Sequence, residues 1–474
     1  MQRSDSWLSV ATIALVALLA GCDQPAPPPP KTVAPAAPPA LKVDAQTQRL
    51  AAEVFVYALP LVLTDLARET EVGEDGWNAL LHRRKLPDPA TKTSLPNGDF
   101  LYSRAWLDLA KEPIVVSAPR MKDRYYLLAL LDGWTNVSSS LGARTTGSDT
   151  AQFAIVGPKW NDKLPPGVLE VRSPTELAWL FGRIEIKGKP DLGQAVKVQD
   201  QFTIVPLSAF GKRRARKGDT PGAGKDETAP RGDPRELLAK MDAAAFFTRF
   251  AQLLPGNPPG EADTSMQEKL KTLGIVPGKP FDVAKRDEVG ARSVAEGART
   301  ALAAIRGAAS NITGGDLTHG WSSDLAVGRW GSDYGKRAVA AWNGIGVNAP
   351  EDAVFFTTHL DGEGRRLEGA NRYVVHFDKG KTPPADGFWS LSLYDAAGHL
   401  VGNPAERFNI GGDDRLKVNA DGSLDIVVAN ADPGGTANWL PAPPGPFRLV
   451  LRIYWPKKEV LDASWSPPGV KRAG

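Results

Sequence analysis

The sequence is poor in sulfur, with one cysteine and four methionines in 474 residues. The single cysteine, Cys22, closes an N-terminal apolar stretch, so the rest of the chain can form no disulfide, bind no metal through sulfur and supply no thiol nucleophile. An excess of charge of either sign is also missing, because 57 Lys and Arg residues are nearly balanced by 54 Asp and Glu residues. The net charge of +3 argues against nucleic acid as a partner.

Several catalytic motifs are absent too. The sequence contains no Gly-x-Ser-x-Gly nucleophile elbow, no phosphate-binding loop with the required spacing and no dinucleotide-binding glycine pattern. The histidines of the second half are scattered, and no two have the spacing of ligands on one helix: His319, His359, His376 and His399. We therefore expect neither a metal nor an organic cofactor.

The N-terminal residues have the pattern of an export signal. Residues 7–20 are apolar but fewer than the roughly 20 that a membrane-spanning helix needs. The stretch ends in Leu19-Ala20-Gly21-Cys22, which resembles a bacterial lipobox. We expect a signal peptide at 1–21, cleavage before Cys22 and lipid on the cysteine sulfur. An ordinary signal peptide or a short uncleaved anchor is the alternative.

Residues 22–43 follow as a segment rich in Pro and Ala. Proline fixes φ and resists both helix and sheet, so we expect an extended tether between the lipid bilayer and the folded part. A lipid on Cys22 would make the bilayer a partner and place the protein on the periplasm-facing side of a membrane. Asp23 resembles an inner-membrane retention signal, which slightly favours the inner membrane and leaves the outer membrane as the alternative.

The patterns after the tether predict a mainly β protein of the α+β class, with two sandwich-like or jelly-roll-like β domains joined by helices. Short apolar or alternating runs bounded by Gly, Pro and Asp predict strands from about Pro113 to Val205 and again from Val354 to Trp455. We expect an N-terminal β-rich domain at 44–210, a basic flexible loop at 211–232, a helical connector at 233–330 and a C-terminal β-sandwich domain at 331–474. Aromatic residues do not interleave the charges of the basic loop, which favours a solvated segment over a binding surface.

Five segments have the spacing of amphipathic helices. In the first, Asp44–Leu63, Pro60 is expected to end or kink the helix. The clearest is Asp233–Leu254, where Asp233 has the position of an N-terminal cap and Pro234 that of the first helical residue. The others are Asp263–Leu273, Glu288–Arg306 and Asp333–Trp342.

Two sets of short motifs occur in order along the chain. The first set includes Asn97-Gly98-Asp99 with Tyr102-Ser103, Trp106-Leu107-Asp108-Leu109, Arg124-Tyr125-Tyr126 and Gly142-Ala143-Arg144-Thr145-Thr146-Gly147. The second set includes Tyr334-Gly335, Phe388-Trp389-Ser390-Leu391, Asn438-Trp439-Leu440-Pro441 and Arg452-Ile453-Tyr454-Trp455-Pro456. On these motifs the chain resembles a bacterial lipoprotein in which domain of unknown function 1254 is followed by domain of unknown function 1214, two families commonly found fused. The resemblance implies two β-rich domains with helices between them, and it supplies no established reaction and no catalytic residues.

The chain departs from the first family at one position. Members of that family usually have threonine directly after the aspartate, where this chain has Phe100. A family activity that depends on the threonine hydroxyl would therefore be missing here.

Polar residues near the expected strand ends of the first domain are the best candidates for chemistry. Asp99 and Asp132 together with Arg124 and Arg144 would combine two carboxylates with two guanidiniums, which suits acid–base catalysis or bidentate orientation of a polar substrate. The candidate binding residues around them are Asn97, Tyr102, Tyr126, Asn136 and His82. Buried acids beside arginines also occur as structural networks that hold loops in place, and this interpretation stays open.

Two main functions remain open. The first is an envelope lipoprotein that binds a small polar or carbohydrate-like ligand, for which a cleft between the two β domains is the expected place. The second is a cofactor-independent hydrolase or lyase, with Asp99 or Asp132 as acid or base and Arg124 or Arg144 stabilising negative charge. A structural role in an envelope complex is a third alternative. The sequence does not decide between these functions, nor does it give the oligomeric state.

Overall fold

Four β-sheets and eight α-helices make up the regular structure of the computed structural model, which describes residues 42–73, 76–212, 223–310, 318–434 and 438–473. The expected signal peptide, Cys22 and nearly all of the expected tether lie outside these residues, as does the middle of the expected basic loop. From Val43 onward the chain clusters as one unit. Its fold is the mixed α+β class that the sequence predicts, and no sheet among the described residues closes into a barrel.

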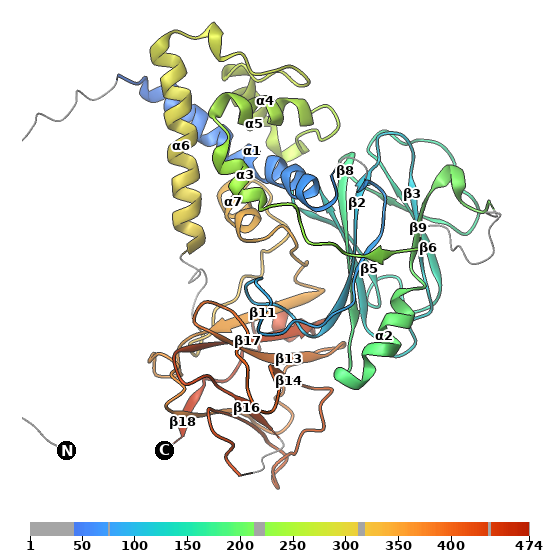
Figure 1. Ribbon diagram of the computed structural model, residues 1–474, viewed down its shortest axis with the longest axis vertical. Coiled ribbons are helices and arrows are strands. Elements are labelled where there is room, and N and C mark those ends of the chain that lie inside the picture. The colour runs from blue at the N-terminus through green and yellow to red at the C-terminus, as the bar shows by residue number, and fades with distance from the viewer. Residues whose placement is uncertain (1–41, 74–75, 213–222, 311–317, 435–437, 474) are drawn as a thin grey trace, which may run out of the picture. The chain divides into compact units, whose positions relative to one another are not determined.

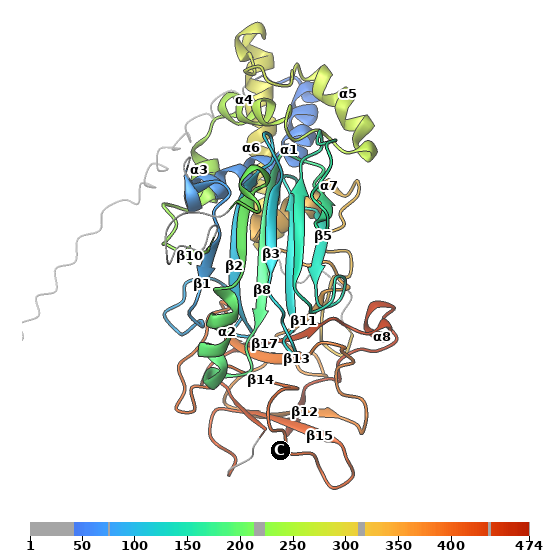
Figure 2. The ribbon, with the colours of Figure 1, turned by 90° about the vertical axis from the view of Figure 1, so that its right-hand side faces the viewer.

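Two sheets form the N-terminal β part. The larger sheet has six strands in the order β10-β1-β2-β8-β4-β5, and the smaller has four in the order β7-β6-β3-β9. Figure 2 shows the long strands of the larger sheet extending between the helices at one end and the C-terminal sheets at the other. The strands are β1 (Leu81–Arg83), β2 (Phe100–Asp108), β3 (Ile114–Ala118), β4 (Tyr126–Asp132), β5 (Val137–Gly142), β6 (Ala151–Val156), β7 (Leu169–Arg172), β8 (Leu177–Glu185), β9 (Thr203–Pro206) and β10 (Lys225–Asp226).

The apolar strand runs between Ile114 and Val205 are confirmed as β3, β4, β6, β7 and β9. The sequence patterns missed β2 and β8, which pair antiparallel along nine residues in the middle of the larger sheet. Both strands carry buried residues on both faces, so the alternation that marks a half-exposed strand is blurred. The expectation that β structure begins only near Pro113 was therefore wrong.

Two four-stranded sheets form the C-terminal β part. Their orders are β11-β17-β13-β14 and β16-β15-β12-β18, and the buried side chains between them form one continuous apolar cluster. This is the sandwich arrangement expected for the second domain. The strands are β11 (Ala353–Thr358), β12 (Arg372–Phe377), β13 (Trp389–Asp395), β14 (Asn409–Gly411), β15 (Leu424–Ala429), β16 (Trp439–Pro441), β17 (Phe447–Tyr454) and β18 (Lys471–Ala473).

Helix α1 (Ala45–Val72) lies at the centre of the helical part, with the neighbouring helices packed around it (Figure 1). It continues for nine residues past Leu63, so the expected end of the helix near Pro60 was wrong, while the alternative that Pro60 kinks the helix stays a prediction. Proline removes one backbone hydrogen bond, but residues 57–66 are buried on every side, and this packing offsets the loss. Among the described residues, α1 is also the one helix long and apolar enough to cross a membrane, yet 72% of its most apolar window is buried in the protein, as is typical of a core helix.

Most of the remaining helices lie within the expected connector, and those between Pro234 and Asn343 contact α1 rather than only linking two domains. The single helix expected at Asp233–Leu254 is two helices, because Asp242 begins a second one by accepting a hydrogen bond from the Ala245 backbone amide. The expected cap at Asp233 with Pro234 in the first turn is confirmed. The helices are α2 (Leu192–Gln199), α3 (Pro234–Lys240), α4 (Ala243–Leu253), α5 (Thr264–Thr272), α6 (Glu288–Ser310), α7 (Tyr334–Asn343) and α8 (Lys458–Leu461).

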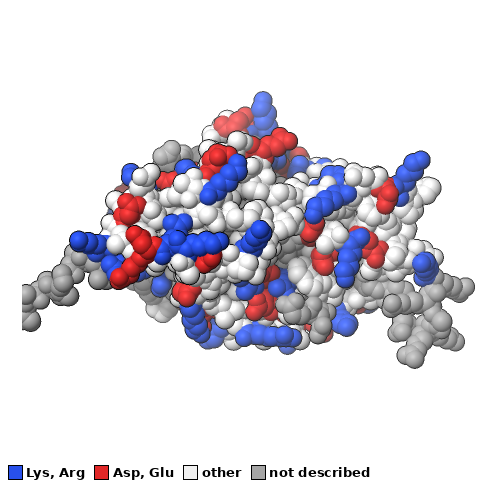
Figure 3. Space-filling model, turned by 90° about the horizontal axis from the view of Figure 1, so that it is seen from above, with Lys and Arg blue, Asp and Glu red and all other residues white. Residues whose placement is uncertain are grey.

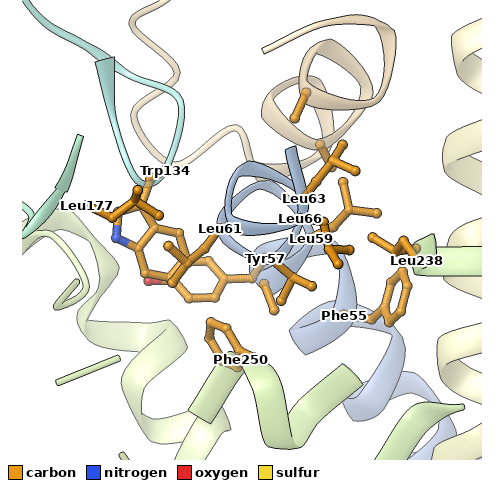
Figure 4. Close-up of a cluster of buried hydrophobic side chains, with 14 of the residues drawn as sticks. Phe55, Tyr57, Leu59, Leu61, Leu63, Leu66, Trp134, Leu177, Leu238 and Phe250 are labelled. Carbon is orange, nitrogen blue, oxygen red and sulfur yellow. The ribbon is translucent and has the colours of Figure 1, made fainter. Parts of the chain in front are cut away.

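Aromatic side chains join α1 to the end of the larger sheet. Figure 4 shows Tyr57, Trp134 and Phe250 gathered beside α1, and the Tyr57 ring centroid lies 4.8 Å from that of Trp134. The hydroxyls of Tyr57 and Tyr334 donate to the two carboxylate oxygens of Asp263 at 2.9 and 2.7 Å. These two hydrogen bonds to Asp263, which lie within an apolar cluster, fix α5 and α7 relative to α1.

The charged side chains are mixed in sign on the face that Figure 3 shows, where Lys and Arg lie among Asp and Glu. This distribution agrees with the nearly balanced composition. A face of this kind gives no broad field that would draw a polyanion to it.

Candidate functional site

Asp99 connects the N-terminal β part to the C-terminal one. It directly precedes β2 and is 4% exposed. Its Oδ2 atom accepts hydrogen bonds from Ser390 Oγ at 2.6 Å and Tyr454 OH at 2.9 Å, and its Oδ1 atom accepts one from Asn409 Nδ2 at 2.7 Å. All three donors come from the C-terminal sheet formed by β11, β17, β13 and β14, so this buried carboxylate is compensated across the boundary between the two parts.

The loop of residues 95–99 carries Asp99 into this position. Asn97 Oδ1 accepts from the Asp99 backbone amide at 2.8 Å, a local turn that suits asparagine, and Asn97 Nδ2 donates to Tyr454 OH at 2.7 Å. The Tyr394 hydroxyl donates to the Pro96 carbonyl at 2.8 Å. The 95–99 loop is therefore held by side chains of both halves of the chain.

A pocket of about 420 Å³ lies beside Asp99, and we refer to it as the Asp99 pocket. Its volume falls in the range typical of small-molecule sites. The lining mixes aromatic and charged side chains. The residues that matter for its chemistry are Gly98, Asp99, Lys187, Lys189, Phe388, Trp389, Ser390, Tyr394, Glu406, Arg407, Asn409 and Asp413.

A pair of acids lies next to this pocket. Glu185, at the end of β8, and Asp413 both line a smaller pocket of about 200 Å³, and Asp413 also lines the Asp99 pocket. Burial raises the pKa of Glu185 to about 7, and a hydrogen bond with the Asp413 carboxyl adds to the rise. A carboxyl group that titrates near neutral pH can hold or release a proton there, and sequence reasoning missed both residues.

Asp132 lies at the opposite end of the larger sheet from Asp99. It ends β4, whose first residues lie beside Glu185 at the other end of β8, and it is 4% exposed. Its carboxylate accepts from the backbone amides of Trp134 and Asn136 and from Asn136 Nδ2, each at 2.9 Å. Burial raises the pKa of Asp132. Asp132 and Asn136 thus hold the turn between β4 and β5.

Each of the two candidate arginines binds a different carboxylate. Arg124 pairs with both oxygens of Asp191, at 2.5 and 2.7 Å, and also donates to the Glu185 carbonyl. Arg144 Nε donates to Asp352 Oδ1 at 2.7 Å. The structure therefore does not bring Asp99, Asp132, Arg124 and Arg144 together in one site.

Two further candidates make contacts away from the Asp99 pocket. The Tyr126 hydroxyl donates to the Gly147 carbonyl at 3.0 Å. His82 is 1% exposed, and its Nδ1 lies 2.9 Å from Ser103 Oγ. Burial lowers the pKa of His82 to about 4, so the ring is neutral at pH 7. These contacts are those of residues that stabilise the sheet.

Phe100 fills the boundary between the two halves. It is 1% exposed, and its ring centroid lies 4.8 Å from Tyr454, 5.6 Å from Phe388 and 6.2 Å from Tyr125. Where the first family usually has a threonine hydroxyl, this chain therefore has an aromatic side chain in an apolar contact. The ring packs beside the hydrogen bonds of Asp99 rather than replacing any of them.

Asn97 and Tyr102 line a second pocket, together with two residues that sequence reasoning did not select as site residues, Arg183 and Arg452. Both arginines are buried, at 5% and 3% exposure. The sequence feature that could have found them is a charged residue within a largely apolar strand. Arg183 lies in Leu177–Glu185 and Arg452 lies in Phe447–Tyr454. Among the described residues, no group of three or more His, Cys, Asp or Glu side chains is arranged to hold a metal ion.

Two family models match the chain. Residues 77–206 match the model described as protein of unknown function DUF1254, and residues 352–458 match the one described as protein of unknown function DUF1214. These matches confirm the two domains that the motifs indicate, in the same order. No curated protein sequence matches the chain.

Solved structures match the fold. The chain is similar to the VPA0106 protein from Vibrio parahaemolyticus, with 22% identity and a TM-score of 0.67 over 90% of this chain and 100% of that one. An uncharacterised protein from Burkholderia cenocepacia matches with 13% identity and a TM-score of 0.43, over 90% of this chain and 94% of that one. The similarity to the Vibrio protein shows the fold and carries no reaction with it.

Proposed function

We propose that the protein is a membrane-anchored envelope lipoprotein that binds a small polar, hydroxyl-rich ligand in the Asp99 pocket. The observation that supports ligand binding is the hydrogen bonding of Asp99. An ionised carboxylate oxygen can accept two hydrogen bonds, and among the described residues Asp99 Oδ1 accepts one, from Asn409. Asp99 therefore brings a buried, oriented acceptor to a pocket that also contains hydroxyl and amide groups.

Aromatic residues support a carbohydrate-like ligand. Phe388, Trp389 and Tyr394 line the pocket together with Asp99 and Asn409. Sugars present apolar faces and polar edges, so a pocket with both aromatic surface and hydrogen-bonding groups suits them. Phe388, Trp389 and Tyr394 are 8%, 7% and 0% exposed. Phe388 packs against Phe100 and Tyr125 of the N-terminal part, so only a small area of Phe388 and Trp389 is open to a ligand.

The membrane anchor is supported by the sequence around Cys22. The Leu19-Ala20-Gly21-Cys22 motif follows an apolar stretch and precedes a Pro/Ala-rich segment, which is the arrangement expected for a lipid-bearing N-terminus. The folded part would then lie on the periplasm-facing side of the membrane. Asp23 slightly favours the inner membrane.

The alternative is a hydrolase or lyase with Asp99 or Asp132 as acid or base and Arg124 or Arg144 stabilising negative charge. This alternative gains no support from the geometry, since Asp99 and Arg124 line different pockets. Asp132 lies at the far end of the sheet from Asp99. Arg124 and Arg144 already compensate Asp191 and Asp352. We therefore favour ligand binding.

The test uses a glycine at the pocket wall. A Cβ atom at Gly98 would meet only Pro87 Cγ, at 3.9 Å, and the backbone there is not in the left-handed region, so the position accepts a side chain and Gly98→Leu should narrow the pocket. Gly445→Leu is the matched control, because a Cβ atom at Gly445 meets nothing within 4 Å and the residue does not line the pocket. Saturation-transfer NMR with glucose and N-acetylglucosamine should give signals with the wild type and Gly445→Leu and weak or no signals with Gly98→Leu. Equal signals from all three proteins, or none from the wild type, would contradict the proposal.

A further inference from the structure

Arg183 and Arg452 are buried cations whose hydrogen bonds go to carbonyl and hydroxyl oxygens. Arg183 Nη2 donates to the Gly346 carbonyl at 3.2 Å, while its Nη1 has no hydrogen-bond partner among the described residues. Arg452 donates to Ser392 Oγ at 2.8 Å and to the Leu95 carbonyl at 3.1 Å, while its Nε has none. Neither guanidinium forms an ion pair within the described part of the chain.

Such an arrangement is unfavourable unless something else compensates the charge. A guanidinium stays protonated at any ordinary pH. Burying a charge without a paired counter-charge is unfavourable, and burial lowers the pKa of Arg183. Burial also acts to lower the pKa of Arg452, but nearby Tyr394, Tyr454 and Asp99 raise it above its ordinary value. Arg183 is therefore the less well compensated of the two charges.

The two side chains line one pocket of about 570 Å³, which we call the arginine pocket. The charged residues of its lining are four arginines and one glutamate: Arg83, Arg104, Arg183, Arg452 and Glu227. Arg83 and Arg104 both pair with Glu227. Arg104 also pairs with Glu71, so these two arginines have two acids between them. Arg183 and Arg452, by contrast, form no ion pair with any described residue.

The pKa of Tyr102 indicates that both guanidiniums interact with the same hydroxyl group. Burial raises the pKa of Tyr102, and the neighbouring charges of Arg183 and Arg452 both oppose that rise. Both arginines thus lie close enough to the Tyr102 hydroxyl to interact with it. A carboxylate next to this hydroxyl would meet two cations and a neutral donor.

The walls of the arginine pocket are aromatic. The rings of Tyr102 and Phe181 are stacked, with centroids 5.3 Å apart and an interplanar angle of 13°. Arg183 lies 4.2 Å from the Phe181 ring centroid, and Arg452 lies 5.5 Å from that of Phe355, which is 40% exposed. Flat apolar surface beside cationic groups suits a ligand that is anionic at one end and flat and apolar at the other.

We infer that the arginine pocket is a second binding site, which takes a small organic acid with its carboxylate at Arg183 and Arg452 and its flat apolar part against the exposed ring of Phe355. The arginine pocket lies next to the Asp99 pocket, and Pro96 lines both. Leu95 and Asn97 line only the arginine pocket, whereas Gly98 and Asp99 line only the Asp99 pocket. Gly98→Leu should therefore leave binding in the arginine pocket unchanged, which keeps the two proposals distinguishable.

The test uses benzoate and its uncharged counterpart benzamide on the purified protein at low salt. Arg183→Met removes the guanidinium and keeps an apolar side chain of similar length. Arg286→Met is the matched control, since Arg286 also donates to one carbonyl, that of Leu273 at 2.6 Å, and lies 5.7 Å from a phenylalanine ring centroid, but outside the pocket. Binding is measured by NMR titration and the thermal midpoint is recorded for each free protein.

We expect benzoate to bind wild type and Arg286→Met at least tenfold more tightly than benzamide, and Arg183→Met to lose that preference. We also expect free Arg183→Met to unfold at the same temperature as the wild type or higher, because the variant no longer buries an unpaired charge. This stability readout separates a binding residue from a structural one. Equal binding of benzoate and benzamide by the wild type, unchanged benzoate binding by Arg183→Met, or a marked loss of stability in that variant would overturn the inference.

Discussion

Tyr454 donates its hydroxyl hydrogen to Asp99 at 2.9 Å, although the two residues are 355 positions apart in the sequence. The same hydroxyl accepts a hydrogen bond from Asn97 at 2.7 Å. The last residue of β17 therefore holds two residues of the 95–99 loop. This contact gives the first prediction.

Asp99→Asn should destabilise the protein by about 2 to 4 kcal/mol. The amide brings a donor to a place where Ser390, Asn409 and Tyr454 all donate. The free energy of unfolding is measured in urea for Asp99→Asn, Tyr454→Phe and the double variant. Residues in direct contact should be coupled by about 0.5 to 3 kcal/mol, and purely additive effects would contradict the contact.

Glu185 should make stability depend on pH. Burial raises its pKa from 4.5 to about 7, so between these values the folded protein holds a proton that the unfolded chain has released. Stability contributed by that proton is complete below pH 4.5 and is lost as the pH rises to 7. In Glu185→Gln the amide can still accept from the Tyr125 backbone amide and donate to Asp413.

The variant should therefore be more stable than the wild type at pH 8, by about 1 to 3 kcal/mol, given 1.36 kcal/mol for each pKa unit. The two proteins should be closely similar near pH 4.5. Urea unfolding at intervals from pH 4.5 to 8 measures the difference. Parallel curves for the two proteins would show that Glu185 does not titrate in this range.

Two glycines of α6 should respond in opposite directions to alanine. A Cβ atom at Gly297 would lie 2.3 Å from the Gln48 carbonyl oxygen and 2.9 Å from Ala51 Cβ on α1, whereas one at Gly307 meets nothing within 4 Å. Gly297→Ala should cost about 2 to 3 kcal/mol by forcing the helices apart. Gly307→Ala should stabilise by about 0.5 to 1 kcal/mol, because alanine favours the helix. Thermal unfolding of both variants checks the pair, and a loss of stability at both positions would contradict the close packing of α1 and α6 as its cause.

Cys22→Ser should abolish membrane attachment by lipid. A thioether to diacylglycerol needs the cysteine sulfur, and the chain has no other cysteine. We expect the mass of the wild-type mature N-terminus to include a diglyceride and the protein to enter the detergent phase of Triton X-114, and the variant to do neither. An unmodified thiol in the wild type, or a leader still attached, would refute the proposed anchor.

The sequence predicted the fold class, the order of the two domains and most strands of the C-terminal part. These features follow from local patterns, as in the alternating run that forms β12 and in the cap at Asp233. The patterns failed where tertiary burial overrides them. Pro60 lies inside a helix that is packed on all sides, and β2 and β8 are buried on both faces.

The candidate site residues stay predictions, and the structure places them in different surroundings. Asn97, Asp99 and Tyr102 do line pockets, whereas Asp132 lies at the far end of the sheet. Residue type alone cannot show which carboxylate each arginine compensates, because the partners of Arg124 and Arg144 are 67 and 208 positions away. Arg183 and Arg452 were not selected from the sequence, because an arginine within an apolar strand can equally well form an ion pair away from any pocket.

The hydrogen bonds of Asp99 have a consequence for how such a chain can be divided. An excised N-terminal half would keep the acceptor and lose every side-chain donor that satisfies it, and an excised C-terminal half would be left with three donors and nothing to receive them. Each half completes the polar interior of the other. We therefore expect the two segments to unfold together as one cooperative unit, and either half alone to be less stable than the whole.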